Sequence, residues 1–249
     1  MLGKRTFNQT TDPEVEVEQG EEIEYLPNGL PKNYNTMVRP GVPDGNDPNN
    51  PVRIYADGVF DMYHIGHAKV LEQAKKLFKH VYLIVGVSPD WETIEKKGKI
   101  VMNENERVEI LKHCKWVDEV IMPCPWIITI DFLRQHKIHY VAHDDEPYSS
   151  AGSKDIYYDV KRLGMFRATQ RTDGISTSDI IMRIIKDYDM YVERSLDRGF
   201  KREEIGISAI KAFRIKLNKK IDEFKKKYLV SKFDKNKKRA PLQPIVDMF

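Results

Sequence analysis

Short apolar runs that alternate with helical patterns start at Val52 and restrict the fold more than any other feature. The runs VRIYA (52–56) and VYLIVGV (81–87) are branched and almost continuously apolar, as in strands that are buried on both faces. The segments DEVIM (118–122) and IHYVAH (138–143) are predicted to be further strands. Strands that alternate with helices predict an α/β fold, in which a parallel sheet with right-handed crossovers is flanked by helices.

Helical spacing of apolar residues predicts the connecting helices. These predicted helices cover residues 65–80, 103–114, 129–136 and 179–193. The segment SPDWETIEKKGKI (88–100) is predicted to be a charged loop.

Composition divides the chain into three parts. Residues 1–50 contain nine acidic and four basic side chains and include RPGVPDGNDPNNP, so we expect a mostly irregular, acidic N-terminal arm. Residues 51–200 are expected to form the catalytic domain. Residues 201–249 contain fifteen basic and six acidic side chains and are expected to form a basic helical extension and tail, suited to an anionic surface.

Sequence signals for the cellular location of the protein are few. The chain has no apolar run long enough to span a membrane, and its N-terminal residues do not resemble a secretory leader. The spacing of Cys114 and Cys124 fits no metal motif, and two thiols suit a reducing compartment. We therefore expect a cytoplasmic protein. KNKKR (235–239) leaves a nuclear location open, and the basic C-terminal part leaves peripheral attachment to membranes open.

The loop DGVFDMYHIGH follows the first predicted strand and opens the first predicted helix. Ligands of such sheets bind beyond the carboxyl ends of the strands, and a helix N-terminus attracts anions. His64 and His67 are placed to donate hydrogen bonds to phosphate oxygens. A zinc site would need further ligands at other spacings, so no protein-bound metal is expected. Two ordinary surface histidines remain an alternative for this motif alone.

A second glycine-containing loop, QRTDGISTSDII (170–181), enters another predicted helix. Ser176 and Asp179 form a capping pattern, and Arg171 can clamp a phosphate with two hydrogen bonds. A well-capped helix is the plain interpretation. Two anion sites in one small α/β domain favour a nucleoside triphosphate.

These two motifs carry a family resemblance. HIGH and RTDGISTSDII, together with MNENER and YVAHDDEPYSSAGSKDIY, resemble the cytidylyltransferase family, and within it the enzymes that act on phosphocholine. The resemblance covers about residues 52–200. The family belongs to the His-x-Gly-His nucleotidyltransferase superfamily, so the resemblance implies a Rossmann-like nucleotidyltransferase fold.

The resemblance implies the reaction of CTP with phosphocholine to give CDP-choline and pyrophosphate, in phosphatidylcholine synthesis. Such a transfer needs positioning and positive charge more than a covalent nucleophile. By resemblance, His64, His67, Lys97 and Arg171 are the expected catalytic residues. Magnesium is expected to accompany CTP.

The same resemblance assigns the substrate-binding residues. Those expected to bind CTP are Val59, Phe60, His67, Lys97, His143, Asp144, Tyr148, Gln170, Arg171, Thr172, Gly174, Ile175, Ser176 and Thr177. Those expected to bind phosphocholine are Asp57, Lys97, Trp126 and Tyr148. A quaternary ammonium is recognised by aromatic faces and carboxylates, which suits this second set. Taken alone, Trp126 could equally be a core residue.

Alternatives remain at the level of function. Phosphoethanolamine is the second candidate substrate, although enzymes for it usually carry two catalytic repeats. A membrane-binding regulatory protein with an inactive core is a further alternative. A nucleic-acid-binding role is not expected, because the chain has no KMSKS-type loop.

Partners are predicted from the family and from the C-terminal part. The family implies a homodimer. Residues 207–230 place apolar side chains at Ile210, Phe213, Leu217, Ile221, Phe224 and Tyr228. This stripe predicts an amphipathic helix, which could bind an anionic membrane reversibly or pack on the core or on a dimer partner.

Overall fold

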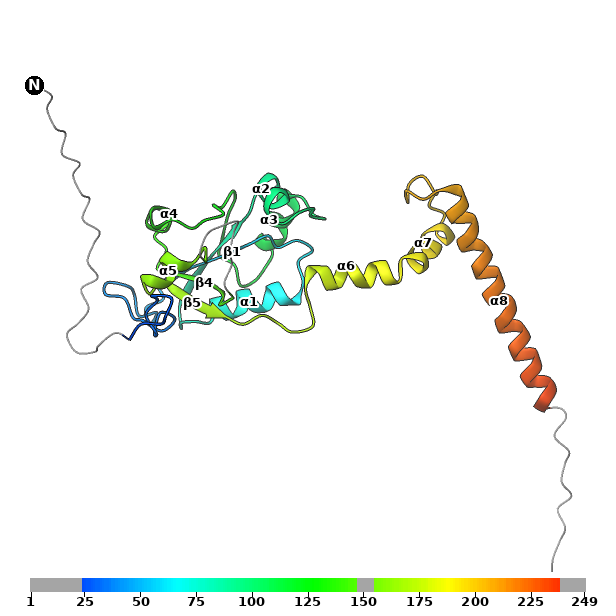
Figure 1. The fold of residues 1–249 in the computed structure, drawn as a ribbon, viewed down its shortest axis with the longest axis horizontal. Coiled ribbons are helices and arrows are strands. Elements are labelled where there is room, and N and C mark those ends of the chain that lie inside the picture. Colours follow the sequence, from blue (N-terminus) through cyan, green and yellow to red (C-terminus); the bar gives the residue numbers. More distant parts are fainter. Residues whose placement is uncertain (1–23, 147–154, 238–249) are drawn as a thin grey trace, which may run out of the picture. The chain divides into compact units, whose positions relative to one another are not determined.

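The computed structural model describes residues 24–146 and 155–237. Tyr148, the first 23 residues and the end of the KNKKR segment lie outside the described residues. The chain divides into two compact units, Met1–Asp179 and Ile180–Phe249. The first contains the sheet and the second contains helices (Figure 1).

The described residues of the first unit form one sheet with five parallel strands in the spatial order β3-β2-β1-β4-β5. The strands are β1 (Val52–Gly58), β2 (Val81–Val87), β3 (Glu119–Ile121), β4 (Tyr140–Asp144) and β5 (Phe166–Thr169). The helices around them are α1 (Ile65–Lys75), α2 (Asp90–Lys96), α3 (Glu104–Lys112), α4 (Ile130–Gln135) and α5 (Tyr158–Arg162). The predicted α/β class with a parallel sheet is therefore confirmed.

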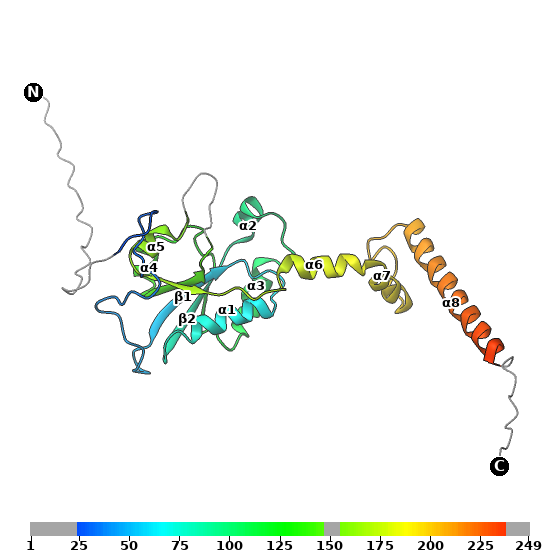
Figure 2. The same ribbon diagram turned by 60° about the horizontal axis from the view of Figure 1, so that its bottom comes forward.

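Both faces of the sheet are buried, which explains the nearly continuous apolar strands. Ile54 and Ala56 of β1 point into one core, where Leu71 of α1 and Leu111 of α3 cover them. Tyr55 points into the opposite core, which is covered from α4 and α5 (Figure 2). The strand pattern predicted burial on both faces, and helices on both faces make the sheet doubly wound.

Four features of the sequence-based prediction need correction. Strand β5 was not predicted, because its four residues contain an arginine, Arg167, which is buried over the Tyr140 ring. Helices α2 and α5 were not predicted either, since each spans less than two helical turns. The helix predicted over residues 65–80 ends at Lys75. The helix predicted over 179–193 is two helices, α6 (Thr177–Lys186) and α7 (Tyr188–Asp197), separated at Asp187, a residue type that favours caps over helix interiors.

The described part of the N-terminal arm, residues 24–50, contains turns and one isolated bridge, and it is bonded to the sheet. The Asn35 side chain accepts a hydrogen bond from the Ala168 N–H of edge strand β5. Arg167 donates to the Met37 carbonyl (2.7 Å). These bonds satisfy polar groups at an edge that would otherwise be open to another strand.

The second unit is built on the packing of α7 against α8 (Ala209–Lys237). Val192 of α7 and Ala212 and Ile215 of α8 are buried together. The exposed apolar side chains of α8 are Ile210, Phe213, Leu217, Ile221 and Phe224. At 100° per residue, this stripe lies on the side of α8 opposite to its contact with α7. None of the helices in the described ranges is both long and apolar enough to cross a membrane.

Packing in the centre of the sheet generates a stability prediction. A Cβ atom on Gly86 would lie 2.0 Å from the Tyr55 hydroxyl oxygen and 2.8 Å from the Cβ of Cys124. We expect Gly86→Ala to lower the free energy of unfolding by about 1–3 kcal/mol, because the core cannot absorb the extra atom without displacement. Urea denaturation measures the effect. Adding Tyr55→Phe, which removes the nearest atom, should restore part of the loss, and additive effects of the two changes would contradict this account.

Candidate active site

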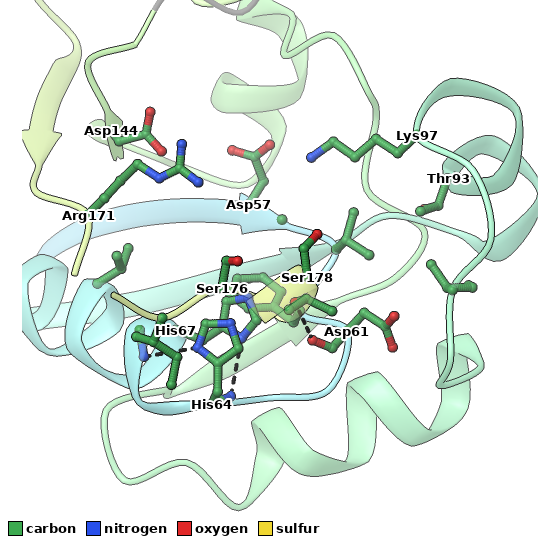
Figure 3. A pocket seen from close by; sticks show the side chains of 18 of the residues that line it. Asp57, Asp61, His64, His67, Thr93, Lys97, Asp144, Arg171, Ser176 and Ser178 are labelled. Atoms are coloured by element: carbon green, nitrogen blue, oxygen red, sulfur yellow. Dashed lines mark hydrogen bonds between the residues drawn. The ribbon is translucent and has the colours of Figure 1, made fainter. Parts of the chain in front are cut away.

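The chain leaves the sheet in opposite directions from β1 and β4, which are neighbours in its centre. The carboxyl ends of these two strands therefore border a crevice, the usual ligand site of doubly wound sheets. A cavity of about 530 Å³ lies there (Figure 3). Asp57 and Gly58 at the end of β1 and His143 and Asp144 at the end of β4 contribute to its wall.

The loop after β1 brings two histidine rings to the cavity. His64 is the N-cap of α1, and its Nδ1 accepts a hydrogen bond from the Gly66 N–H (3.0 Å). The Nδ1 of His67 accepts from the His64 N–H (3.3 Å). Because Nδ1 serves as an acceptor in both rings, each neutral imidazole carries its proton on Nε2. Gly66 allows this arrangement, since a Cβ there would lie 2.8 Å from the His64 ring.

The two imidazole rings are stacked, with their centroids 3.9 Å apart. Burial lowers the pKa of His64. Burial and the neighbouring His64 together lower the pKa of His67 to about 4. Both rings are therefore neutral near pH 7, and they offer N–H donors to an anion without the mutual repulsion of two stacked cations.

A second helix N-terminus reaches the same cavity. Ser176 precedes α6, accepts a hydrogen bond from the Asp179 N–H (3.1 Å) and donates to the Asp179 carboxylate (2.7 Å), so the predicted capping by these two residues is confirmed. Thr177 donates its hydroxyl to the Asp61 carbonyl (3.0 Å), which joins α6 to the loop after β1. Two N-termini directed at one cavity give it a positive potential without full charges.

Full charges surround the cavity as well. Figure 3 shows Arg171 and Lys97 reaching toward Asp57 from opposite sides, with Asp144 near Arg171. Burial lowers the pKa of Lys97, while Asp57 and Asp144 act in the opposite direction. Lys97 and Arg171 lie near these carboxylates in the free cavity. Both side chains are placed to bind a polyanion that enters the cavity.

Lys97 follows α2, and Arg107 anchors the start of that helix. Arg107 is fully buried on α3 and donates to the carbonyls of Val59 (2.7 Å) and Ser88 (2.9 Å). It also pairs with the Asp90 carboxylate at 2.6 Å. One buried guanidinium thus connects the loop after β1 to the helix that precedes Lys97. Losing such a charge pair inside the protein typically costs about 3–5 kcal/mol.

Asp57 lies on the floor of the cavity beside an aromatic pair. Burial raises the pKa of its carboxyl group. The Tyr157 hydroxyl donates to the carboxylate, 3.1 Å from either oxygen, and the Tyr157 ring stacks on His143 at 4.6 Å. Trp126 is outside the cavity wall, and its ring centre lies 5.7 Å from Lys96 Nζ and 5.6 Å from Lys97 Nζ. Trp126 is therefore a surface that already attracts cations.

Most of the residues expected from the sequence share this cavity. Its wall includes Asp57, Val59, Phe60, His64, His67, Lys97, His143, Asp144, Arg171, Thr172, Ile175, Ser176 and Thr177. Gln170, Gly174 and Trp126 are not part of the wall, and Tyr148 lies outside the described residues. Gln170 is instead held by the side chain of Gln73 through two hydrogen bonds (2.8 and 2.9 Å), which fixes the residue before Arg171.

Sequence reasoning missed several residues of this site. Asp61 and Thr93 line the cavity, Arg107 and Gln73 hold its loops, and Tyr157 binds Asp57. Asp61 stands inside the quoted histidine loop and could have been found there. Arg107 ends the segment MNENER and Tyr157 ends YVAHDDEPYSSAGSKDIY, so both stand in segments that carry the family resemblance. Gln73 and Thr93 lie outside the four motifs named for that resemblance, and only the folded chain brings them to the site.

Fold and cavity together define a doubly wound α/β domain with one cavity at the carboxyl ends of its central strands, where two helix N-termini and two cationic side chains meet. The sequence profile of cytidylyltransferase-like proteins matches residues 55–183, just over half of the chain. The chain belongs to the cytidylyltransferase-like family.

Individual relatives give a finer comparison. The chain is 55% identical over 177 residues to choline-phosphate cytidylyltransferase A of Rattus norvegicus, covering 71% of this chain and 48% of that protein. It is 58% identical over 168 residues to a probable choline-phosphate cytidylyltransferase of Schizosaccharomyces pombe, covering 67% and 46%. It is 39% identical over 135 residues to ethanolamine-phosphate cytidylyltransferase of Dictyostelium discoideum, covering 54% and 37%. The chain spans about half the length of the curated choline-phosphate relatives it matches.

The depressed pKa of His67 predicts a pH-dependent stability. The unfolded chain binds the proton near pH 6.5, whereas the folded protein binds it only near pH 4. The free energy of unfolding should therefore fall as the pH drops below 6.5, by about 1 kcal/mol between pH 7.5 and 5.5 for this group alone. Urea denaturation of wild type and His67→Gln at both pH values isolates this contribution. A His67 ring that titrates near pH 6.5 by NMR in the folded protein would contradict it.

Proposed function

We propose that this protein transfers the cytidylyl group of CTP to phosphocholine, producing CDP-choline and pyrophosphate for phosphatidylcholine synthesis. One observation carries the proposal: two helix N-termini, two Nε2–H imidazoles and the cations Lys97 and Arg171 converge on one cavity. The high identity to choline-phosphate cytidylyltransferases supports this substrate over phosphoethanolamine.

In the proposed reaction, a phosphate oxygen of phosphocholine forms a bond to the α-phosphorus of CTP. The bond from that phosphorus to the β-phosphate bridging oxygen breaks, and pyrophosphate leaves with the electron pair. His64 and His67 donate Nε2–H hydrogen bonds to the triphosphate, where negative charge grows as the bond breaks. Lys97 and Arg171 reduce the repulsion between the two anionic substrates and hold them in line.

The nucleoside end of CTP is assigned to the ends of β4 and β5. His143 and Asp144 border the cavity at the end of β4, and residues 170–177 pass beside it. Backbone groups of that segment and of Val59 and Phe60 can bind cytosine and ribose. Gln73, by holding Gln170, keeps this segment at the cavity.

Asp57 and aromatic rings are the proposed choline site. A trimethylammonium group cannot donate N–H hydrogen bonds, so it needs a carboxylate and π-faces. Asp57 supplies the carboxylate, Tyr157 orients it, and Trp126 offers a face that already attracts lysine ammonium groups. Tyr148 remains a predicted member of this site.

Magnesium is proposed to enter with CTP as part of the substrate complex. Within the described residues, no three His, Cys, Asp or Glu side chains converge in a way that could hold a metal ion. The carboxylates of Asp57 and Asp61 accept hydrogen bonds from the protein. The triphosphate oxygens are the natural ligands of the ion.

Further proposals concern assembly and location. We propose a homodimer, because the resembling family is dimeric. We also propose a cytoplasmic or nuclear protein that binds anionic membranes reversibly through α8, whose apolar stripe is exposed and flanked by lysines. No nucleic-acid partner is proposed.

Substrate choice and Trp126 provide the main test. Pyrophosphate release from CTP should be fastest with phosphocholine, slower with phosphoethanolamine and slowest with glycerol phosphate. Trp126→Ala should raise the KM for phosphocholine by about tenfold, from the loss of a cation–π contact, with little change in the KM for CTP.

Two variants control this experiment. Trp91→Ala removes an exposed tryptophan that does not line the cavity and should leave both KM values unchanged. His64→Ala combined with His67→Ala should lower turnover by about two or more orders of magnitude in a folded protein. Equal activity with all three acceptors, or near-normal turnover of the double variant, would refute the proposed function.

The stripe on α8 generates a separate prediction. Anionic vesicles should bind the protein, and binding should weaken as salt rises, because each lysine near the surface contributes about 1 kcal/mol. Replacing Phe213, Leu217 and Phe224 with serine should abolish vesicle binding and leave lipid-free activity intact. If the wild-type protein never binds vesicles and the triple variant melts earlier, the stripe packs against protein instead.

A further inference from the structure

Asp61 lies at a junction of three segments around the cavity. Its side chain is buried, with 6% of the residue exposed. The two carboxylate oxygens accept hydrogen bonds from the backbone N–H groups of Val101 (2.9 Å) and Met102 (2.8 Å). Its carbonyl accepts from Thr177 at the start of α6. A carboxylate with two backbone donors makes charge-assisted bonds, stronger than neutral ones.

The segment that Asp61 holds is the one that carries Lys97. The N–H groups of Lys97 and Gly98 still bond to carbonyls of α2. From Lys99 to Met102, the backbone hydrogen bonds in the described structure are the two to Asp61. This short segment, residues 97–102, is thus fixed at its first end by α2 and at its last end by Asp61.

The backbone around Asp61 is unusual on both sides. Phe60 and Met62 have φ angles of 56° and 47°, in the left-handed region that residues with side chains rarely adopt. Such conformations persist only where the surroundings enforce them, and they gather at functional sites. The sharply kinked loop from Gly58 to Met62 is the loop expected to contact CTP. Through its bonds to Val101 and Met102, Asp61 connects this loop directly to the Lys97 segment.

We propose that Asp61 is a positioning residue for Lys97. By anchoring Val101 and Met102 to the nucleotide loop, it restricts where the Lys97 ammonium group can lie, so that the lysine meets the phosphates of a bound triphosphate. Because both oxygens are bonded to the backbone N–H groups of the Lys97 segment, Asp61 acts on the site through Lys97. The expected effect on catalysis rests on the proposed function. The anchoring of Val101 and Met102 by Asp61 does not depend on that function.

A double-mutant cycle tests the coupling. Asp61→Asn keeps the shape of the side chain and replaces one acceptor with an NH2 group that faces a backbone N–H. In the wild-type background it should lower kcat/KM by about tenfold or more, because displacement of a group by about 1 Å can cost up to about 10²-fold. In a Lys97→Ala background the same change should cost less than about twofold, since residues that act as a unit are not additive. Equal losses in both backgrounds would overturn the proposal.

Controls separate positioning from a general loss of stability. Thr129→Ala removes the N-cap of α4, outside the cavity, and its effect on kcat/KM should be small and the same in both backgrounds. If Asp61→Asn does not fold, Asp61→Glu replaces it in the double-mutant cycle. This variant keeps the charge and shifts the carboxylate oxygens by one methylene group.

Amide hydrogen exchange tests the anchoring without any measurement of enzyme activity. In Asp61→Asn, the Val101 and Met102 amides should exchange faster than in the wild type, whereas Thr129→Ala should leave them unchanged. Unchanged exchange in Asp61→Asn would overturn the proposal. If the wild-type protein shows no transfer from CTP to phosphocholine, the proposed function fails, and the exchange result still decides whether Asp61 anchors the segment.

Discussion

The divergence of the chain between β1 and β4 is the constraint on which the site depends. The connections of these neighbouring parallel strands run to opposite sides of the sheet, so their carboxyl ends leave a crevice that no crossover covers. Asp57 stands at the end of β1 and His143 at the end of β4. The helix that His64 caps and the helix that follows Ser176 both begin at this crevice. The position of the cavity is therefore a consequence of the strand order.

The cavity combines neutral hydrogen-bond donors with charged side chains that lie near groups of opposite charge. The stacked imidazoles of His64 and His67 stay neutral, since burial and their mutual contact lower both pKa values. Lys97 and Arg171 lie near the carboxylates of Asp57 and Asp144, which act against the effect of burial on the pKa of Lys97. Because the imidazoles are neutral and the cations lie near carboxylates, like charges do not repel one another in the free cavity. In the proposed function, the same N–H groups and cations bind the triphosphate.

Buried cations hold the irregular segments that the sheet itself cannot fix. Arg107 bonds to the carbonyls of two loops, and Arg167 bonds to the N-terminal arm. Lys161 pairs with Asp145 (3.0 Å) and Asp155 (2.7 Å), beyond the end of β4. Loops lack the regular backbone hydrogen bonds of a sheet or helix. Side chains with several N–H donors can bind their carbonyl groups instead. Asp61 does the same with the opposite charge, which is why its bonds to the Lys97 segment matter for the proposed chemistry.

The sequence by itself determined the fold class and located the two glycine-containing loops that enter helix N-termini. Buried parallel strands must be apolar on both faces, and the histidine loop and RTDGIST each carry their own glycine and cap, so both signals are local. The sequence did not predict β5, because an arginine is not expected in a buried strand. It also did not predict that α6 and α7 are separated at Asp187. Only the tertiary structure decided which residues complete the site. Tyr157, next to α5, bonds to Asp57 at the end of β1, and Arg107 reaches Val59 from α3. Packing brings together these side chains, whose separation in sequence carries no pattern.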